Sequence, residues 1–404
     1  MSADRPELDR CSRCGECRAV CPVFRETRRE TDVARGRLLR YRLARDAGRF
    51  SAADREAFSR CLLCGRCLEA CKAQVDVPAL MQIAKTDSGF AAGWPSLLTE
   101  KTLADDGRLD AAVRRYRSLS RWLGRATPDD SGLRLRFALP YLDAGRLYPK
   151  PPARGYLEQH TGRRASGVQK LAFFAGCGAG RLLTGVGEAV DRVLAELNLT
   201  AAIPEQACCG LAAWGIGATD AARRTAIAWV RSFAGEEYDA ILSPCASCTA
   251  HLQTRLPQIL AGTEFAADAA RLAAKVEDFF AWLSRQDLCF DLAGLKVGAH
   301  VPCHARREVR DGAAFVSFLK KSGAELVKID ERLDAQCCGM GGSFGVLHPE
   351  LSRRIGLPKV AALRAAGAAV LVTNCTGCLW QLRDLAARFD PALPVRHPVE
   401  LLDR

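Results

Sequence analysis

The chain has 404 residues, 49% of them hydrophobic, and a mean hydropathy of −0.05, which predicts a soluble globular protein with two or three domains. It contains no apolar run near the roughly 18 residues that a membrane span needs, and residues 1–5 lack the apolar core of a secretion signal. We therefore expect a cytoplasmic protein, in which 19 cysteines favour metal binding over disulfides.

The formal net charge of +12 is concentrated in residues 1–168, which hold 32 Lys and Arg against 21 Asp and Glu. A basic part of this kind is a solvated surface or meets something acidic, such as a partner subunit or the anionic inner leaflet of the cytoplasmic membrane. Its arginines are not interleaved with aromatic residues, so we do not expect nucleic acid as a partner.

Residues 1–90 contain two copies of the spacing Cys-x-x-Cys-x-x-Cys-x-x-x-Cys. This is the run of bacterial ferredoxins, in which three cysteines hold one [4Fe–4S] cube and the fourth serves the other cube. We therefore expect a helical ferredoxin domain with two cubane clusters. One cluster is assigned to Cys11, Cys14, Cys17 and Cys71, and the other to Cys61, Cys64, Cys67 and Cys21.

Two details of these runs bear on the assignment. Gly15 and Gly65 are expected to let the backbone close around the sulfur atoms. Pro22 follows the first run, whereas Lys72 follows the second, and its charge is expected to raise the potential of the nearby cluster. The alternative is a pair of zinc sites, but a zinc site does not require the x-x-x-Cys-Pro spacing of the fourth cysteine.

The stretch between the runs predicts two helices. Leu39 and Leu43, four residues apart, indicate an amphipathic helix whose arginines face solvent. Ser51, followed by Asp54 three residues later, predicts a capped second helix. Residues 91–168 then form a connector, with a helix over 97–123 and a proline-rich linker that either wraps over the next domain or docks a partner.

Residues 169–290 and 291–404 repeat one pattern, because corresponding cysteines lie 126 to 130 residues apart. Each unit is expected to have a strand ending at a single cysteine (170–177, 295–303) and a helix (186–197, around 316–319). A second short strand leads to Cys-Cys-Gly, and a third (240–242, 369–372) ends at Cys-x-x-Cys. This alternation predicts an α/β unit with a mainly parallel sheet, whose carboxyl edge gathers the ligands.

The five cysteines of each unit are therefore expected to converge. The two quintets are Cys177, Cys208, Cys209, Cys245, Cys248 and Cys303, Cys337, Cys338, Cys375, Cys378. Adjacent cysteines suit an open or shared cluster better than an ordinary cube, and Gly210 and Gly339 permit the sharp turn that follows them. Cys289 lies outside both patterns and is interpreted as a buried core cysteine.

Three histidines are weaker candidates for a role at the cysteine clusters. His304 follows Cys303 directly and is the candidate catalytic residue, either bonding a cluster sulfide or supplying a proton. A role as an ordinary polar residue is the alternative. His300 and His348 also lie close to the cysteine motifs in the sequence.

With these motifs in place, the chain resembles the iron–sulfur subunits of bacterial glycolate oxidase and D-lactate dehydrogenase complexes. It is also similar to the iron–sulfur subunits of heterodisulfide reductases. The resemblance rests on 18 of the 19 cysteines and on the domain order. It implies an α+β and α/β protein in which an N-terminal helical ferredoxin domain with two [4Fe–4S] clusters precedes duplicated α/β Cys-Cys-Gly domains. It also implies that the quintets hold one or two further [4Fe–4S] clusters of the non-cubane kind.

The function implied is electron transfer in a 2-hydroxy acid dehydrogenase complex, from a separate FAD-binding subunit to a quinone or another carrier. No Gly-x-Gly-x-x-Gly follows a strand, since Phe344 stands where the third glycine would be, so FAD is expected only in the partner. Such a subunit is cytoplasmic or peripheral on the inner face of the membrane. The alternative is a thiol–disulfide oxidoreductase of the heterodisulfide reductase type, which the two complete quintets favour.

Overall fold

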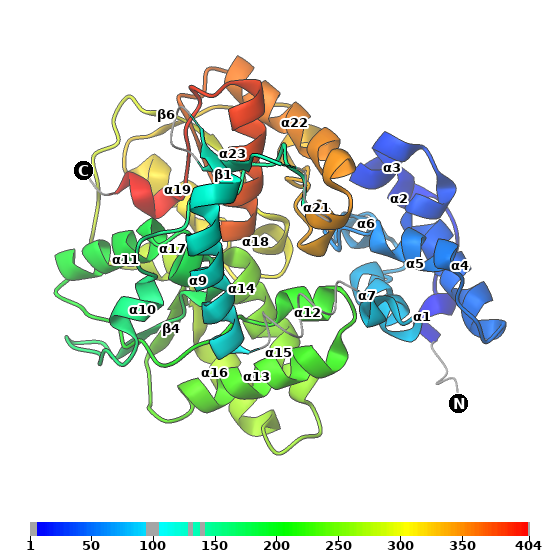
Figure 1. Cartoon of the computed structure of the whole chain (residues 1–404), viewed down its shortest axis with the longest axis horizontal. Coiled ribbons are helices and arrows are strands. Elements are labelled where there is room, and N and C mark those ends of the chain that lie inside the picture. Colours follow the sequence, from blue (N-terminus) through cyan, green and yellow to red (C-terminus); the bar gives the residue numbers. More distant parts are fainter. Residues whose placement is uncertain (1–5, 94–104, 128–131, 138–141, 403–404) are drawn as a thin grey trace.

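The computed structural model describes residues 6–93, 105–127, 132–137 and 142–402. A small helical domain at the N-terminus lies beside a larger body of helices and sheets (Figure 1). The larger body contains two parallel sheets, of three and four strands. This architecture confirms the predicted fold class. Among the described residues, no helix combines the length and the apolar character needed to cross a bilayer.

The N-terminal domain is entirely helical over its described residues. Its elements are α1 (Pro6–Asp9), α2 (Glu16–Val20), α3 (Pro22–Thr27), η1 (Glu30–Asp32), α4 (Ala34–Asp46), α5 (Ala52–Ser59), α6 (Arg66–Glu69), α7 (Val77–Asp87) and η2 (Phe90–Ala92). Ser51 caps α5 through a reciprocal pair of bonds with Asp54, as predicted.

The predicted helix between the cysteine runs exists as α4, but its buried face was predicted wrongly. Leu39 and Leu43 are 38% and 61% exposed, whereas Leu38 and Tyr41 are buried. Tyr41 packs against Phe58 and its hydroxyl donates to Asp87, so the partners α5 and α7 decide the orientation of the helix. Arg37 lies on this buried face, which also corrects the prediction that the arginine-rich face of the helix is exposed to solvent.

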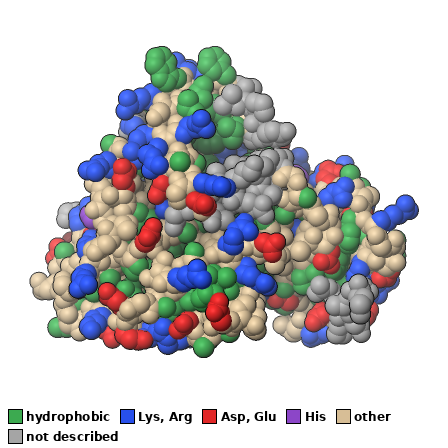
Figure 2. Space-filling view, turned by 60° about the horizontal axis from the view of Figure 1, so that its bottom comes forward, with side chains coloured by type: hydrophobic (Ala, Val, Ile, Leu, Met, Phe, Trp, Pro, Cys, Tyr) green, Lys and Arg blue, Asp and Glu red, His purple; other side chains and the backbone are tan. Residues whose placement is uncertain are grey.

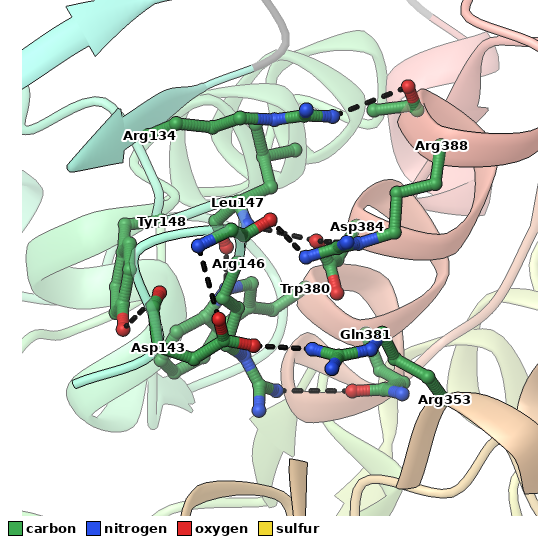
Figure 3. A network of polar contacts seen from close by, with 12 residues as sticks. Arg134, Asp143, Arg146, Leu147, Tyr148, Arg353, Trp380, Gln381, Asp384 and Arg388 are labelled. Atoms are coloured by element: carbon green, nitrogen blue, oxygen red, sulfur yellow. Dashed lines mark hydrogen bonds and ion pairs between the residues drawn. The ribbon is translucent and has the colours of Figure 1, made fainter. Parts of the chain in front are cut away.

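The connector includes α9 (Asp106–Leu123), the antiparallel pair β1 (Gly124–Ala126) and β2 (Leu133–Leu135), and α10 (Tyr156–His160). The predicted helix over 97–123 is confirmed from residue 106 onward, while residues 97–104 lie outside the described part of the chain. Residues 143–148 pack on the C-terminal unit. There the amide of Leu147 donates to Asp384 and Arg146 donates to Gln381 (Figure 3).

The first cysteine-rich unit is built around the sheet β3-β4-β5. Its elements are β3 (Leu171–Phe173), η4 (Gly178–Leu182), α11 (Gly185–Glu196), α12 (Leu211–Gly215), α13 (Thr219–Phe233), β4 (Ala240–Ser243), α14 (Ala246–Ala250), η5 (His251–Arg255), α15 (Leu256–Leu260), α16 (Ala266–Lys275), β5 (Val276–Asp278) and α17 (Phe279–Leu283).

The second unit is built around the sheet β7-β6-β8-β9. Its elements are β6 (Lys296–Ala299), α18 (Cys303–Arg307), α19 (Ala314–Lys321), β7 (Glu325–Leu326), α20 (Glu331–Asp334), α21 (Ser343–Leu347), α22 (Pro349–Ala365), β8 (Val370–Val372), α23 (Thr376–Phe389), β9 (Val395–Arg396) and η6 (Pro398–Leu401).

The two units share one topology with a difference at the second short strand. In the second unit this strand is β7, which pairs with β6 in parallel. In the first unit the corresponding segment makes isolated bridges, a parallel one between Ala172 and Ala202 and an antiparallel one between Ser166 and Thr200. Buried side chains from both sheets, including Phe173 and Leu371, belong to one continuous hydrophobic core. The N-terminal domain has a smaller core of its own around Tyr41 and Met81.

The loops that follow β4 and β8 contact each other across this shared core. The amide of Ala246 donates to the carbonyl of Asn374 at 2.8 Å, and the Asn374 side chain donates to Asp278 at 3.0 Å. Both loops lie at the carboxyl ends of their parallel strands, where side chains from several segments can meet. Basic and acidic side chains are interspersed over the outer face drawn in Figure 2.

Candidate metal centres

The first ferredoxin run contributes to a small cavity beside α2. The thiols that line this cavity of about 30 Å³ are Cys11, Cys14, Cys17 and Cys71, together with Cys67. Gly15 begins α2 with a φ of 96°, a left-handed conformation that glycine adopts without strain. A Cβ atom there would lie 2.8 Å from the end of the flexible Arg35 side chain, so the left-handed backbone is the main reason for glycine at this position.

The second run makes a cavity of similar volume, about 30 Å³, around the other four cysteines. Its thiols are Cys21, Cys61, Cys64 and Cys67. Gly65 repeats the conformation of Gly15 with a φ of 74°, and the side chain that approaches it is Arg307, from the second cysteine-rich unit. The structure therefore brings together each of the two sets of four that the spacing predicts.

Arg37 is a buried cation at the second cavity that sequence reasoning missed. It is 2% exposed and donates to the carbonyls of Ala57 at 3.0 Å and Arg60 at 2.9 Å. Although burial lowers the pKa of Arg37, its electrostatic interactions with the neighbouring Cys61 and Cys21 raise it above its usual value. A permanent positive charge therefore faces the second set of thiols.

The ten thiols of the two quintets also converge. In the first unit, Cys208 contacts Cys177 and Cys209, while Cys248 contacts Cys209 and Cys245. In the second unit, Cys337 contacts Cys303 and Cys338, and Cys378 contacts Cys338 and Cys375. The Sγ atoms of Cys338 and Cys378 lie 3.3 Å apart. Both quintets are buried except at their single upstream cysteines, which are partly exposed.

The paired cysteines have the same local geometry in both units. Gly210 and Gly339 each have a φ of 92°, which confirms the sharp turn predicted after each pair. In the second unit the amide of Gly339 donates to Cys337 at 3.4 Å, and that of Met340 donates to Cys338 at 3.5 Å. These contacts point backbone N–H groups at the sulfur atoms, an arrangement that favours thiolates.

The second cysteine of each pair is the thiol that is most easily deprotonated within that pair. Contacts with Cys208 and Cys248 lower the pKa of Cys209 to about 6. Contacts with Cys337 and Cys378 likewise hold the pKa of Cys338 well below its usual range. Since the thiolate is the form that ligates metals, both pairs are suited to metal binding.

The quintets meet at the loops after β4 and β8. The Sγ atoms of Cys245 and Cys375 lie 4.0 Å apart, and Cys245 also contacts the hydroxyl of Thr376 at 3.4 Å. Ser247 Oγ lies 3.1 Å from the Cys375 sulfur and 2.9 Å from His304 Nδ1. His304 therefore lies at the junction of the two units, while Ser247 and Thr376, which sequence reasoning missed, line the same junction.

The N-terminal domain contacts both units, the first through a bond from Lys85 Nζ to the carbonyl of Gly215 at 2.9 Å, but its thiols adjoin the second quintet. Burial, together with the neighbouring thiol of Cys303, raises the pKa of Cys64 to about 12. Cys64 and Cys21 pack against the core of the larger body, whereas Cys11 and Cys71 pack in the small N-terminal core. Arg307 pairs with Glu69 at 2.7 Å and donates to the carbonyl of Cys303, so it ties the two domains together at this point.

The remaining candidates are placed differently. Cys289 is exposed, with its sulfur 3.6 Å from the carbonyl of Lys321, so its assignment as a buried core residue was wrong. The segment that joins the two units leaves this side chain at the surface. His348 contacts Ser59 at 2.8 Å across the domain interface, and His300 lies beside Cys338 in the second quintet.

Known families match this chain over its cysteine-bearing segments. Residues 7–75 match the 4Fe-4S dicluster domain, and residues 171–253 and 297–383 each match the cysteine-rich domain. Lactate utilization protein A of Geobacillus kaustophilus (strain HTA426) is 31% identical over 241 residues, which are 58% of this chain and 98% of that protein. The chain belongs to this family of iron–sulfur subunits with cysteine-rich domains.

A second relative extends the comparison. One subunit of the anaerobic glycerol-3-phosphate dehydrogenase of Escherichia coli (strain K12) is 27% identical over 275 residues, or 65% of this chain and 66% of that subunit. A hypothetical protein from Helicobacter pylori has a similar fold, with a TM-score of 0.52 at 9% identity, over 99% of this chain and 72% of that one. These matches make the chain an iron–sulfur electron-transfer subunit of the lactate utilization and glycerol-3-phosphate dehydrogenase type.

The residues present fit iron–sulfur clusters. The thiols of residues 11–71 line two cavities, the donor sets consist of sulfur, and positive charge and backbone N–H groups face them. The paired cysteines were the sequence signal from which the ligand groups of the two cysteine-rich units could be predicted. Arg37, Ser247 and Thr376 gave no such signal, because each is brought to the thiols by packing.

Proposed function

We propose that this subunit passes electrons from a separate FAD-binding 2-hydroxy acid dehydrogenase subunit, acting on glycolate or D-lactate, to a quinone or another carrier. The name of the Geobacillus relative, a lactate utilization protein, supports a hydroxy acid as the source of the electrons. The single observation that carries the proposal is the unbroken series of thiol groups from the N-terminal domain to the first cysteine-rich unit.

The proposed ligand sets follow the groups of thiols described above. Two cubane [4Fe–4S] clusters are assigned to the cavities of the domain at residues 1–90. One or two further clusters, of the non-cubane kind, are assigned to the quintets of the domains at residues 169–290 and 291–404. The connector at residues 91–168 joins these two domains to the N-terminal domain. When bound, these clusters supply one-electron transfer.

The chain's own residues order the four groups in space. The set containing Cys14 lies outermost, since that thiol is exposed. The set containing Cys64 follows, and it faces Cys303 of the second unit. The junction between Cys245 and Cys375 then makes the first quintet the last group in this series of thiols. The quintet that adjoins the thiols of the N-terminal domain is thus that of the second unit, although this unit comes later in the sequence and the first unit also contacts the domain through Lys85 and Thr86.

Two further parts of the proposal concern the junction and the location. His304 is the candidate catalytic residue, because Ser247 connects its Nδ1 to the sulfur of Cys375. The subunit is proposed to be cytoplasmic, or peripheral on the inner face of the membrane, where a membrane-bound acceptor would be reached.

The test combines the anaerobically purified chain with its flavoprotein partner. We expect brown protein with iron and acid-labile sulfide, whose visible absorbance bleaches on addition of D-lactate or glycolate only when the flavoprotein is present. The matched control replaces Cys245 and Cys375 by serine, which should preserve bleaching of the N-terminal clusters and slow reduction of an added quinone. Colourless protein, or protein that contains only zinc, would overturn the proposal.

A second function is favoured by the meeting of two complete quintets. A junction that brings Cys245 and Cys375 within 4.0 Å could accept the two halves of a disulfide, as a thiol–disulfide oxidoreductase of the heterodisulfide reductase type requires. The discriminating experiment reduces the isolated subunit with dithionite, removes the excess, and adds a low-molecular-weight disulfide. Stoichiometric thiol release without a flavoprotein would favour this function over simple electron transfer.

A further inference from the structure

The two quintets differ in the pair of side chains behind their cysteines. In the second unit, His300 lies three residues before Cys303 and contacts Lys359 on α22, with His300 Nδ1 3.1 Å from Lys359 Nζ. In the first unit, Phe174 lies three residues before Cys177 and packs edge-on against Trp229 of α13, with ring centroids 6.2 Å apart. All four side chains are at most 1% exposed.

These pairs occupy corresponding places. A Cβ atom on Gly176 would lie 3.2 Å from the Phe174 ring and 3.6 Å from the sulfur of Cys248, so this ring lies close to the last cysteine of its quintet. In the second unit, a ring nitrogen of His300 and the sulfur atoms of Cys338 and Cys378 all lie within 4.8 Å of one another. Duplication has therefore left an aromatic pair at one site and a polar, basic pair at the other.

The tautomer of His300 follows from its neighbour. A lysine ammonium has three donors and no acceptor, so it donates to Nδ1, and the proton of the neutral imidazole is then on Nε2. Lys359 is held in place by a second bond, from Nζ to the carbonyl of Asp334 at 2.5 Å. Nε2 has no hydrogen-bond partner among the described residues, although His300 is 1% exposed, so it is the donor left for the sulfur atoms.

We propose that Lys359 and His300 form a relay that directs one N–H donor and one positive charge at the sulfur atoms of the second quintet, and thereby raises the potential of the cluster bound there. His300 is a positioning residue in this relay and not a metal ligand, because a protonated Nε2 has no lone pair to offer. A donor to sulfur and a nearby cation both stabilise the more negative, reduced form of a cluster. The first quintet has the neutral Phe174 and Trp229 instead.

This inference rests on the proposed binding of a cluster by the second quintet, and the experiment separates the two. Iron and sulfide content of the unaltered chain tests cluster binding. Redox titration of the full-length protein, followed by electron paramagnetic resonance, then compares it with His300→Phe and Lys359→Met. We expect both variants to keep their iron, to lower the midpoint potential of one cluster of the larger body, and to leave the N-terminal clusters unchanged.

The matched control is Phe174→Leu, which disturbs packing at the corresponding place in the first unit and should leave the potential of the second cluster where it was. Unchanged midpoint potentials in either variant, or an equal shift in the midpoint potentials of all clusters, would refute the relay. Loss of the second cluster in His300→Phe alone would instead make His300 a ligand and also refute it.

Should neither variant fold, the unaltered protein labelled with ¹⁵N-histidine still decides the matter. A weak nitrogen coupling with an exchangeable proton is expected on the reduced second cluster. A strong direct coupling, or none, would contradict the assignment.

Discussion

The sulfur atoms of Cys245 and Cys375 lie 4.0 Å apart, although the two residues are 130 positions apart in the sequence. Each is the first cysteine of its Cys-x-x-Cys motif and follows the third predicted strand of its unit. The contact joins two quintets that the sequence presents as separate. A substitution at this junction is therefore expected to alter the thiol groups of both units, whereas a substitution at a paired cysteine should alter those of its own unit.

Cys338→Ser should remove one cluster of the larger body. Its thiol contacts Cys337 and Cys378 and is held below its usual pKa, so it is the most thiolate-like member of the second pair. We expect iron content to fall by the iron of one cluster while the spectra of the N-terminal clusters persist. Cys289→Ser, at an exposed cysteine outside both quintets, is the control and should change nothing. Unchanged iron in Cys338→Ser would show that this thiol is not a ligand.

Gly339→Ala should be far more destabilising than Gly367→Ala. Both glycines have similar left-handed conformations, with φ of 92° and 88°. A methyl group on Gly339 would lie 2.3 Å from the carbonyl oxygen of Ser352, whereas nothing lies within 4 Å of one on Gly367. We expect losses in the free energy of unfolding of about 4 kcal/mol and about 1 kcal/mol respectively, measured by denaturant titration. Equal losses would mean that the turn relaxes around the added methyl group.

Arg146→Ala should loosen the connector from the second unit. This buried guanidinium donates to the Gln381 side chain at 3.0 Å and to the carbonyl of Gly345, and it lies over the ring of Trp380 (Figure 3). Removing it leaves buried acceptors unpaired, so we expect a loss of about 3 kcal/mol in the free energy of unfolding.

The control for this loss is Arg136→Ala, at an exposed arginine whose side chain donates to the carbonyl of Gly124 at 2.9 Å. Its cost should stay below about 1 kcal/mol. Faster proteolytic cleavage within the connector of Arg146→Ala, with Arg136→Ala unchanged, would be the second sign of loosening. Similar stabilities of the two variants would contradict the role of Arg146.

Acid should weaken the interface between the N-terminal domain and the second unit. Ser59 donates its hydroxyl hydrogen to Glu56, so it accepts from His348 Nε2 across the interface. Burial, and then the charge of Arg60, lowers the pKa of His348 from 6.5 to about 4. A histidine with a depressed pKa is neutral when folded and takes up a proton when released, so its contribution is present above pH 6.5 and is lost as the pH falls toward 4.

His348→Gln removes the titrating group while retaining a donor for Ser59. We expect the stability of this variant to fall less steeply between pH 6.5 and 4 than that of the unaltered chain, measured by thermal unfolding across that range. Parallel pH profiles would show that other groups account for the acid sensitivity.

Sequence alone determined the fold class, the duplication and the grouping of cysteines into motifs. These depend on local spacing and on the period of apolar residues, which a single segment carries within itself. Ser51 and Asp54 at the start of α5, and the glycines after each cysteine pair, belong to the same class of local signals.

Only the tertiary structure decided which of these groups adjoin. The neighbour of Cys64 is Cys303, the buried face of α4 carries Leu38 instead of Leu39, and Cys289 is exposed. Contacts of this kind join residues far apart in the sequence, and they are fixed by how whole elements pack and by the burial that packing achieves. No local pattern encodes that outcome, because the same helix or loop can present a different face to a different neighbour.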